Sequence, residues 1–227
     1  MRATVHFSEA DHARISAAVA AAERESDGEI VTIVAQNSDA YHDAGLHWAI
    51  GAVFLALSAA AAFPGHARRL IAFLLGEWDH GIEDWRFLTV LLGLLILKFL
   101  AVRYALAWRP LRMALTPRGT KARRVRRRAV TLFRAVAQGR TRAKTGVMIY
   151  LSLDEHRAEI VADAAINDKV EPAVWGEAMA ALIAGVRAGQ AAQGMIDAIG
   201  QVGAILNAHF PRSHDDFNEL PDRLIEL

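Results

Sequence analysis

Hydrophobic side chains dominate two stretches near the middle of the chain. Residues 46–63 contain no Asp, Glu, Lys or Arg, and residues 87–108 contain only Lys98 and Arg103 from that group. As a helix, the first stretch would extend roughly 27 Å, close to the thickness of about 30 Å of a bilayer's hydrocarbon core. The pattern therefore predicts two transmembrane helices, over about 46–63 and 87–108.

The sequence between these stretches, residues 64–85, is predicted to connect them into a hairpin. Its apolar patch, residues 70–75, is too short to cross a bilayer and is expected to lie at the interface. The alternative for the first stretch is an Ala-rich helix buried in a large soluble core. A chain of 227 residues has little protein with which to cover two such helices, which favours the membrane.

The rest of the chain has the periodicities of an α/β domain. Ser8 and Asp11 form a plausible capping box at the start of the first helix. Apolar residues at helical spacing predict helices over 8–26, 116–137, 171–188 and 190–209. Runs rich in β-branched residues predict strands over 29–36, 146–153 and 157–163, and a small amphipathic piece is expected over 220–227.

This order of elements predicts an α/β fold, a three-layer α/β/α sandwich with a small mixed sheet, interrupted by a transmembrane helical hairpin. The turn at 154–156 is short enough to make the second and third strands an antiparallel hairpin. The membrane hairpin is inserted in the crossover between the first and second strands. The predicted domains are 1–44 and 116–211 for the two parts of the α/β domain, 45–115 for the hairpin, and 212–227 for a C-terminal tail.

Charge is strongly segregated although the net charge is only +1. Residues 1–44 carry three basic and eight acidic side chains, and residues 145–227 carry five and thirteen. Between Arg103 and Lys144 there are fourteen Lys or Arg and no Asp or Glu. Basic residues that flank a span are retained in the cytoplasm. The residues predicted to set topology and meet the membrane surface are Arg109, Arg112, Arg118, Lys121, Arg123, Arg124, Arg126, Arg127 and Arg128.

This topology places both termini and the α/β domain on the cytoplasmic side of the cytoplasmic (inner) membrane. The expected partners are the lipid bilayer and its anionic headgroups. Nucleic acid is not expected, because no aromatic side chains are interleaved with the basic ones. Lys98 is expected to reach the interface with its long stem. The first stretch holds no acidic residue to pair with Lys98, which argues against a transporter.

Candidates for catalysis are few. The chain has no cysteine, which excludes disulfides, thiolate metal sites and a Cys nucleophile. It also lacks the H-E-x-x-H, P-loop and G-x-S-x-G motifs, so no catalytic residue is predicted. Asp39, Asp163 and Asp168 follow strand ends, where α/β sheets place ligands, and carboxylates suit Mg²⁺ or Ca²⁺. These three are the candidate metal ligands. The alternative is that the three carboxylates are only solvated caps and that the protein binds no cofactor.

Several segments resemble the TPM domain family, which is named for proteins of the thylakoid lumen and photosystem repair and has bacterial and animal membrane relatives. They are the strand GEIVTIVAQ (28–36), the strand KTGVMI (144–149), the charged turn 154–157 and the strand AEIV (158–161). The resemblance covers about 8–44 and 117–211. It implies a mixed sheet with helices on both faces and, in some members, acid phosphatase activity and divalent-cation binding.

The chain departs from the family pattern in two places. Residues 163–166 read DAAI where the family commonly has glycines, and the crossover carries two predicted spans that secreted members lack. Glycine lets backbone amides approach a phosphate more closely than alanine does. The predicted function is therefore a membrane-anchored, non-catalytic interaction module for an unidentified membrane protein partner in envelope protein maintenance or assembly. The alternative is a divalent-cation-dependent phosphatase.

Overall fold

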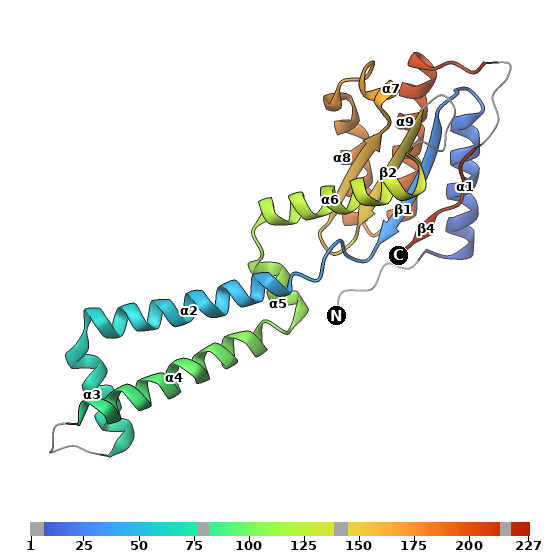
Figure 1. Ribbon diagram of the computed structural model, residues 1–227. Coiled ribbons are helices and arrows are strands. Elements are labelled where there is room, and N and C mark those ends of the chain that lie inside the picture. The colour runs from blue at the N-terminus through green and yellow to red at the C-terminus, as the bar shows by residue number, and fades with distance from the viewer. Residues whose placement is uncertain (1–6, 77–81, 139–144, 214–218) are drawn as a thin grey trace. The chain divides into compact units, whose positions relative to one another are not determined.

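The chain forms two compact units in a computed structural model that describes residues 7–76, 82–138, 145–213 and 219–227 (Figure 1). Met1–Asp39 and Arg118–Leu227 form the first, here called the α/β unit, and Ala40–Pro117 form the second, the helical unit. The α/β unit is thus built from both sides of the inserted segment. Residues 77–81 of the predicted connection, residues 214–218 of the predicted tail, and Lys144 lie outside the described residues.

A mixed sheet forms the centre of the α/β unit, as the sequence predicted, and it has four strands where the sequence predicted three. The strands are β1 (Glu29–Ala35), β2 (Gly146–Ser152), β3 (Arg157–Ala162) and β4 (Ile225–Glu226), in the order β3-β2-β1-β4. β1 and β2 run parallel and β3 is antiparallel to β2. All seven residues of β1 and of β2 are buried, because helices cover both faces of these two central strands.

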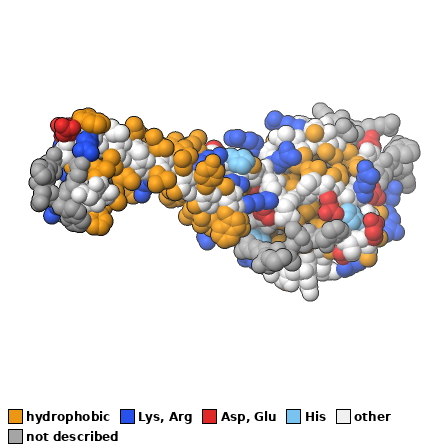
Figure 2. Space-filling model, turned by 90° about the horizontal axis from the view of Figure 1, so that it is seen from below, with side chains coloured by type: hydrophobic (Ala, Val, Ile, Leu, Met, Phe, Trp, Pro, Cys, Tyr) orange, Lys and Arg blue, Asp and Glu red, His pale blue; other side chains and the backbone are white. Residues whose placement is uncertain are grey.

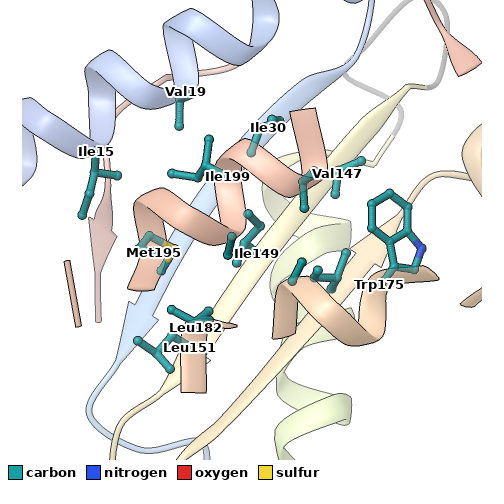
Figure 3. Packing of buried hydrophobic residues seen from close by; sticks show 14 of the residues in the cluster. Ile15, Val19, Ile30, Val147, Ile149, Leu151, Trp175, Leu182, Met195 and Ile199 are labelled. Atoms are coloured by element: carbon teal, nitrogen blue, oxygen red, sulfur yellow. The ribbon is translucent and has the colours of Figure 1, made fainter. Parts of the chain in front are cut away.

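One face of the sheet is covered by α1 (Glu9–Glu23), α8 (Trp175–Arg187) and α9 (Ala191–His209). The other face is covered by α6 (Arg118–Val136). Successive side chains of β1 point to opposite faces of the sheet. Ile30 therefore lies in the core under α1, α8 and α9, called the first core, and Val31 lies in the core under α6, the second. The three-layer sandwich is therefore confirmed. Figure 3 shows the first core, where the labelled side chains are Ile15, Val19, Ile30, Val147, Ile149, Leu151, Trp175, Leu182, Met195 and Ile199.

The C-terminal residues complete the sheet, in contrast to the separate tail expected from the sequence. β4 pairs with β1 in parallel, and the N–H of Leu227 donates to the carbonyl of Val34 at 2.9 Å. Leu220 and Leu224 are each only 4% exposed. Leu220 packs in the core under α6 and Leu224 in the core under α1. The last residues are thus an integral part of the α/β unit.

The helical unit consists of α2 (His42–Ala62), α3 (Pro64–Leu75), α4 (Asp84–Ala105) and α5 (Arg109–Leu115). α2 and α4 pack against each other as an antiparallel pair (Figure 1). Both are long and apolar enough to cross a membrane. Figure 2 shows hydrophobic side chains spread over the surface of this unit.

The predicted connection contains a helix, α3, which is attached to the start of α4. Arg68 Nη2 lies 2.6 Å from Asp84 Oδ1, and the guanidinium of Arg68 lies 4.9 Å from the ring centroid of Phe87. The second span was predicted to reach residue 108, but α4 ends at Ala105 and a separate short helix begins at Arg109. Pro110 explains this break, because proline removes a backbone donor and is favoured in the first turn of a new helix.

Candidate functional site

The carboxyl ends of the parallel strands β1 and β2 lie at one edge of the sheet, where α/β folds commonly bind ligands. The loop of residues 36–39 follows β1, and the turn of residues 154–156 follows β2. The two segments are joined by a hydrogen bond of 2.6 Å from Gln36 Nε2 to Asp154 Oδ1. A backbone hydrogen bond of 3.0 Å from the N–H of Leu153 to the carbonyl of Ala35 reinforces the connection.

A buried polar network holds the loop in place. Ser38 Oγ lies 3.0 Å from Tyr150 Oη and donates to Ser152 Oγ, also at 3.0 Å. Ser152 Oγ in turn donates to Glu155 Oε2, while Glu155 Oε1 accepts the N–H of Ser38 at 3.0 Å. An ionised carboxylate only accepts, so Glu155 fixes the direction of donation along Tyr150, Ser38 and Ser152. The backbone conformation at Ser38 is therefore set by groups on β2 and the following turn.

The environment shifts two pKa values here. Burial raises the pKa of Tyr150 above its usual value, an effect that the Glu155 carboxylate reinforces and the Ser38 and Ser152 hydrogen bonds partly offset. Burial lowers the pKa of Lys121 on α6, and the nearby Arg157 adds to this while Glu155 opposes it. Both shifts indicate a site partly withdrawn from water.

Tyr150 should therefore lose its proton only above the ordinary tyrosine pKa of about 10. Because the folded protein holds this proton more tightly than the unfolded chain, its contribution to stability is complete below pH 10 and is lost as the pH rises through the folded value. We expect Tyr150→Phe to remove a step above about pH 10 from a tyrosinate absorbance titration. A titration of Tyr150→Phe that retains every step of the wild type would contradict the assignment.

A basic face of α6 stands opposite the loop. Arg124, Arg127, Arg128 and Thr131 are spaced i, i+3, i+4 and i+7, so they share one side of the helix. Together with Ser38 and Asp39 they line a pocket of about 200 Å³. Arg124 Nη1 lies 2.8 Å from Asp39 Oδ2, an ion pair between two partly exposed side chains. All of these residues belong to the α/β unit.

The three predicted metal ligands are not brought together. Asp39 lies at the carboxyl edge just described, whereas Asp163 is buried beside the start of β2, where its Oδ2 accepts the N–H of Gly146 at 3.2 Å. The seven residues of β1 put the two edges roughly 20 Å apart. The reason is the antiparallel direction of β3, which ends at the opposite edge from β1. Asp168 is exposed and follows the short helix α7 (Ala164–Asn167) at the same edge as Asp163.

Throughout the described residues, no group of three or more His, Cys, Asp or Glu side chains is arranged to hold a metal ion. Asp163 instead has a structural position, because its backbone N–H also donates to the carbonyl of Gly146 at 2.9 Å. It ties the end of β3 to the start of β2.

The nine predicted surface cations fall in different environments. Arg112 was predicted at the membrane surface, but its side chain is buried, with 8% exposed. Its Nη1 donates to the carbonyl of Leu106 at 3.2 Å. It therefore stabilises the turn after α4 within the helical unit. Arg126 is exposed and pairs with Glu159 of β3 at 3.2 Å. The remaining residues are Arg109, Arg118, Arg123, Arg127 and Arg128, which are exposed, and Lys121 and Arg124, which are partly exposed.

Sequence reasoning missed the polar side chains of the network. Tyr150 and Ser152 alternate with Leu151, so they share one face of β2 at a spacing of two. That spacing is the signal that could have been used, since a serine at the end of an otherwise apolar strand points to the same side as the tyrosine. Glu155 gave no comparable signal, because acidic residues are common in turns.

Comparisons with known proteins agree with this architecture. No curated protein matches the chain. Among solved structures, the NMR structure of the BA42 protein from the psychrophilic bacterium Bizionia argentinensis is similar, with a TM-score of 0.57, 18% identity and coverage of 100% of both chains. At this identity the likeness concerns the fold alone. Residues 111–205 match the TPM domain family, which confirms the resemblance found in the sequence. Over these residues, somewhat under half of the chain, the protein is accordingly similar to a TPM domain.

Proposed function

We propose that this chain is an integral membrane protein in which α2 and α4 anchor the α/β unit to the bilayer. The observation that carries the proposal is the exposure of the two helices. Only 11% of the most hydrophobic 18-residue stretch of α2 is buried, and none of the corresponding stretch of α4 is buried. Apolar surface in water costs about 25 cal/mol per Å², so this surface favours lipid. The large exposed side chains include Phe54, Leu55, Leu57, Leu88, Leu92, Ile96 and Leu97.

The pairing of β1 with β2 supports a hairpin with two crossings. β1 precedes the helical unit and β2 follows it, yet the two strands are hydrogen-bonded neighbours. They must therefore lie on the same side of the membrane, which an even number of crossings allows. The basic residues of α5 and α6 follow the second crossing directly, and such residues are retained in the cytoplasm. Both termini and the α/β unit are accordingly cytoplasmic.

In this arrangement the α/β unit acts as an interaction module at the inner surface of the membrane. The exposed arginines of α6 suit anionic lipid headgroups, each contributing about 1 kcal/mol close to the surface. The candidate metal ligands lie at opposite edges of the sheet, which supports a binding role over metal-dependent hydrolysis. The partner is an unidentified membrane protein, and the expected context is maintenance or assembly of envelope proteins.

A reporter enzyme that is active only after export tests anchoring and orientation together. Fused after Gly76, beyond the first crossing, it should be active; fused after Leu227, it should be silent. A reporter that is silent at both positions would contradict the membrane hairpin. Activity after Leu227 with silence after Gly76 would reverse the orientation.

A further inference from the structure

The elbow of residues 106–116, which follows α4 and includes α5, contains a buried arginine without a carboxylate partner. Arg112 is 8% exposed, and its Nη1 donates to the carbonyl of Leu106 at 3.2 Å. Its Nε is buried and has no hydrogen-bond partner, and none of the ion pairs among the described residues includes Arg112. A guanidinium stays protonated in proteins. A charge withdrawn from water is costly unless an opposite charge and hydrogen bonds compensate it, so Arg112 calls for an anion.

A second cation, Arg103 of α4, lies beside Arg112 against the same part of α2. A Cβ atom added at Gly45 of α2 would lie 3.9 Å from Arg103 Nη1 and 3.9 Å from Arg112 Cδ. Arg103 is partly exposed, and within the described part of the chain its side chain has no hydrogen bond or ion pair. Two positive charges therefore meet at one place in the helical unit, and no acidic side chain is bonded to either of them.

Hydrogen bonds hold the elbow, and with it Arg112, in place. The indole Nε1 of Trp48 on α2 donates to the carbonyl of Leu115 at the end of α5, at 3.1 Å. Thr116 Oγ1 is buried and donates to the carbonyl of Arg112 at 2.8 Å, and the N–H of Arg112 donates to the carbonyl of Trp108 at 3.1 Å. Figure 1 shows α5 beside the start of α2 and the end of α4. The backbone that carries Arg112 is thus fixed before any ligand binds.

Aromatic side chains indicate the depth of the two arginines in a bilayer. Trp48, Tyr104 and Trp108 are exposed around the elbow, and Trp85 is exposed at the start of α4. Tryptophan and tyrosine are enriched at the level of the lipid headgroups. The 19 residues from Trp85 to Tyr104 extend about 28 Å along a helix, close to the hydrocarbon thickness of about 30 Å. With α4 across the membrane as proposed above, both arginines lie at the level of the cytoplasmic headgroups.

We propose that Arg103 and Arg112 bind the phosphodiester group of an anionic phospholipid in the cytoplasmic leaflet, an inference that rests on the proposed membrane anchoring. Planar guanidinium groups match the oxygens of a phosphate in pairs, and Arg112 uses only Nη1 within the protein. A choline headgroup brings its own positive charge, which two neighbouring arginines repel, so phosphatidylglycerol is preferred to phosphatidylcholine. Basic pockets between membrane helices on the cytoplasmic side commonly hold anionic headgroups. This site belongs to the helical unit and is separate from the arginines of α6.

The test is native mass spectrometry of the full chain in detergent, titrated with phosphatidylglycerol or with phosphatidylcholine of the same acyl chains. The wild type should bind phosphatidylglycerol at least about tenfold more tightly than phosphatidylcholine. Arg103→Gln and Arg112→Gln should each weaken binding of phosphatidylglycerol by about tenfold, because each removes a charged donor. The matched control is Lys98→Gln, which removes a cation from an exposed position of α4 on another side of the helix. It should change the affinity by less than about twofold.

Equal weakening by Lys98→Gln and Arg103→Gln, or a wild type without preference for phosphatidylglycerol, would overturn the proposal. A wild type that lacks this preference and carries a bound membrane protein would assign the arginines to a carboxylate of that protein instead. Melting temperatures show whether each variant is folded, and Arg103→Gln decides alone if Arg112→Gln unfolds. Membrane fractionation separates this failure from failure of the anchoring. A chain that stays in carbonate-washed membranes but shows no lipid preference would refute the lipid site alone, whereas a chain released by the wash would refute both.

Discussion

Deletion of residues 219–227 is expected to lower the free energy of unfolding of the α/β unit by roughly 4–8 kcal/mol. Burying two leucine side chains contributes about 3–6 kcal/mol, and each backbone hydrogen bond lost adds about 1 kcal/mol. The deletion removes Leu220 and Leu224, both 4% exposed. It also removes the N–H that Leu220 donates to the buried Glu29 at 3.1 Å. Since domains are stable by about 5–15 kcal/mol, most of the stability would be lost.

Pulse proteolysis of the full chain in mild detergent across a urea series measures this effect. The substitutions Leu220→Ala and Leu224→Ala together should reproduce most of it, since each truncates a buried leucine. Leu227→Ala serves as the control, because this side chain is 55% exposed. An unchanged urea midpoint after the deletion would show that β4 does not stabilise the sheet.

The fold was predictable where local patterns determine structure. β1 and β2 are continuous runs of apolar and β-branched residues because both of their faces are covered. β4 was not predictable in this way, since it is two residues long and its pairing with β1 is decided by tertiary contacts of Leu220 and Leu224. Short edge strands of this kind carry too little pattern to be distinguished from a tail.

The candidate site was predicted only in part. Arg124, Arg127 and Arg128 were expected at the membrane surface, where a basic helix after a span is common. In the structure Val125, Ala129 and Phe133 of α6 pack on the sheet, which turns the neighbouring arginines toward the loop after β1. The spacing of α6 was visible in the sequence. Its orientation over the sheet edge was not, because that depends on which strands the apolar stripe covers.

The position of Asp163 shows how strand direction controls a site. Residues that follow strands meet at one edge only when those strands run parallel. The antiparallel turn between β2 and β3 was recognised in the sequence, yet Asp163 was still grouped with Asp39. The antiparallel direction of β3, which the sequence indicates, is enough to place Asp163 and Asp39 at opposite edges of the sheet. The basic pocket, by contrast, depends on the parallel pairing of β1 and β2 through the long crossover.

Aspartates placed in the middle of α4 should expel the chain from the membrane. Leu92 and Ile96 are 59% and 52% exposed and lie one helical turn apart. In a bilayer, each aspartate near the helix centre costs about 2.5–3.5 kcal/mol, so Leu92→Asp, Ile96→Asp should cost roughly 5–7 kcal/mol. In water, the same changes at exposed positions would alter stability by less than about 0.5 kcal/mol each. The double aspartate variant should therefore be strongly destabilised if α4 crosses a bilayer and almost unchanged in stability if α4 lies in water.

Fractionation of cells distinguishes them. The wild type should stay in the membrane pellet through washes with high salt and alkaline carbonate, because binding by exposed arginines alone is screened by salt. The double aspartate variant should leave the pellet, appearing in the supernatant or being degraded. The swap Leu92→Ile, Ile96→Leu keeps the apolar surface and should behave as the wild type does. Retention of the aspartate variant in the washed pellet would contradict a crossing by α4, and release of the wild type by salt would show that the arginines, and not the hairpin, hold the protein to the membrane.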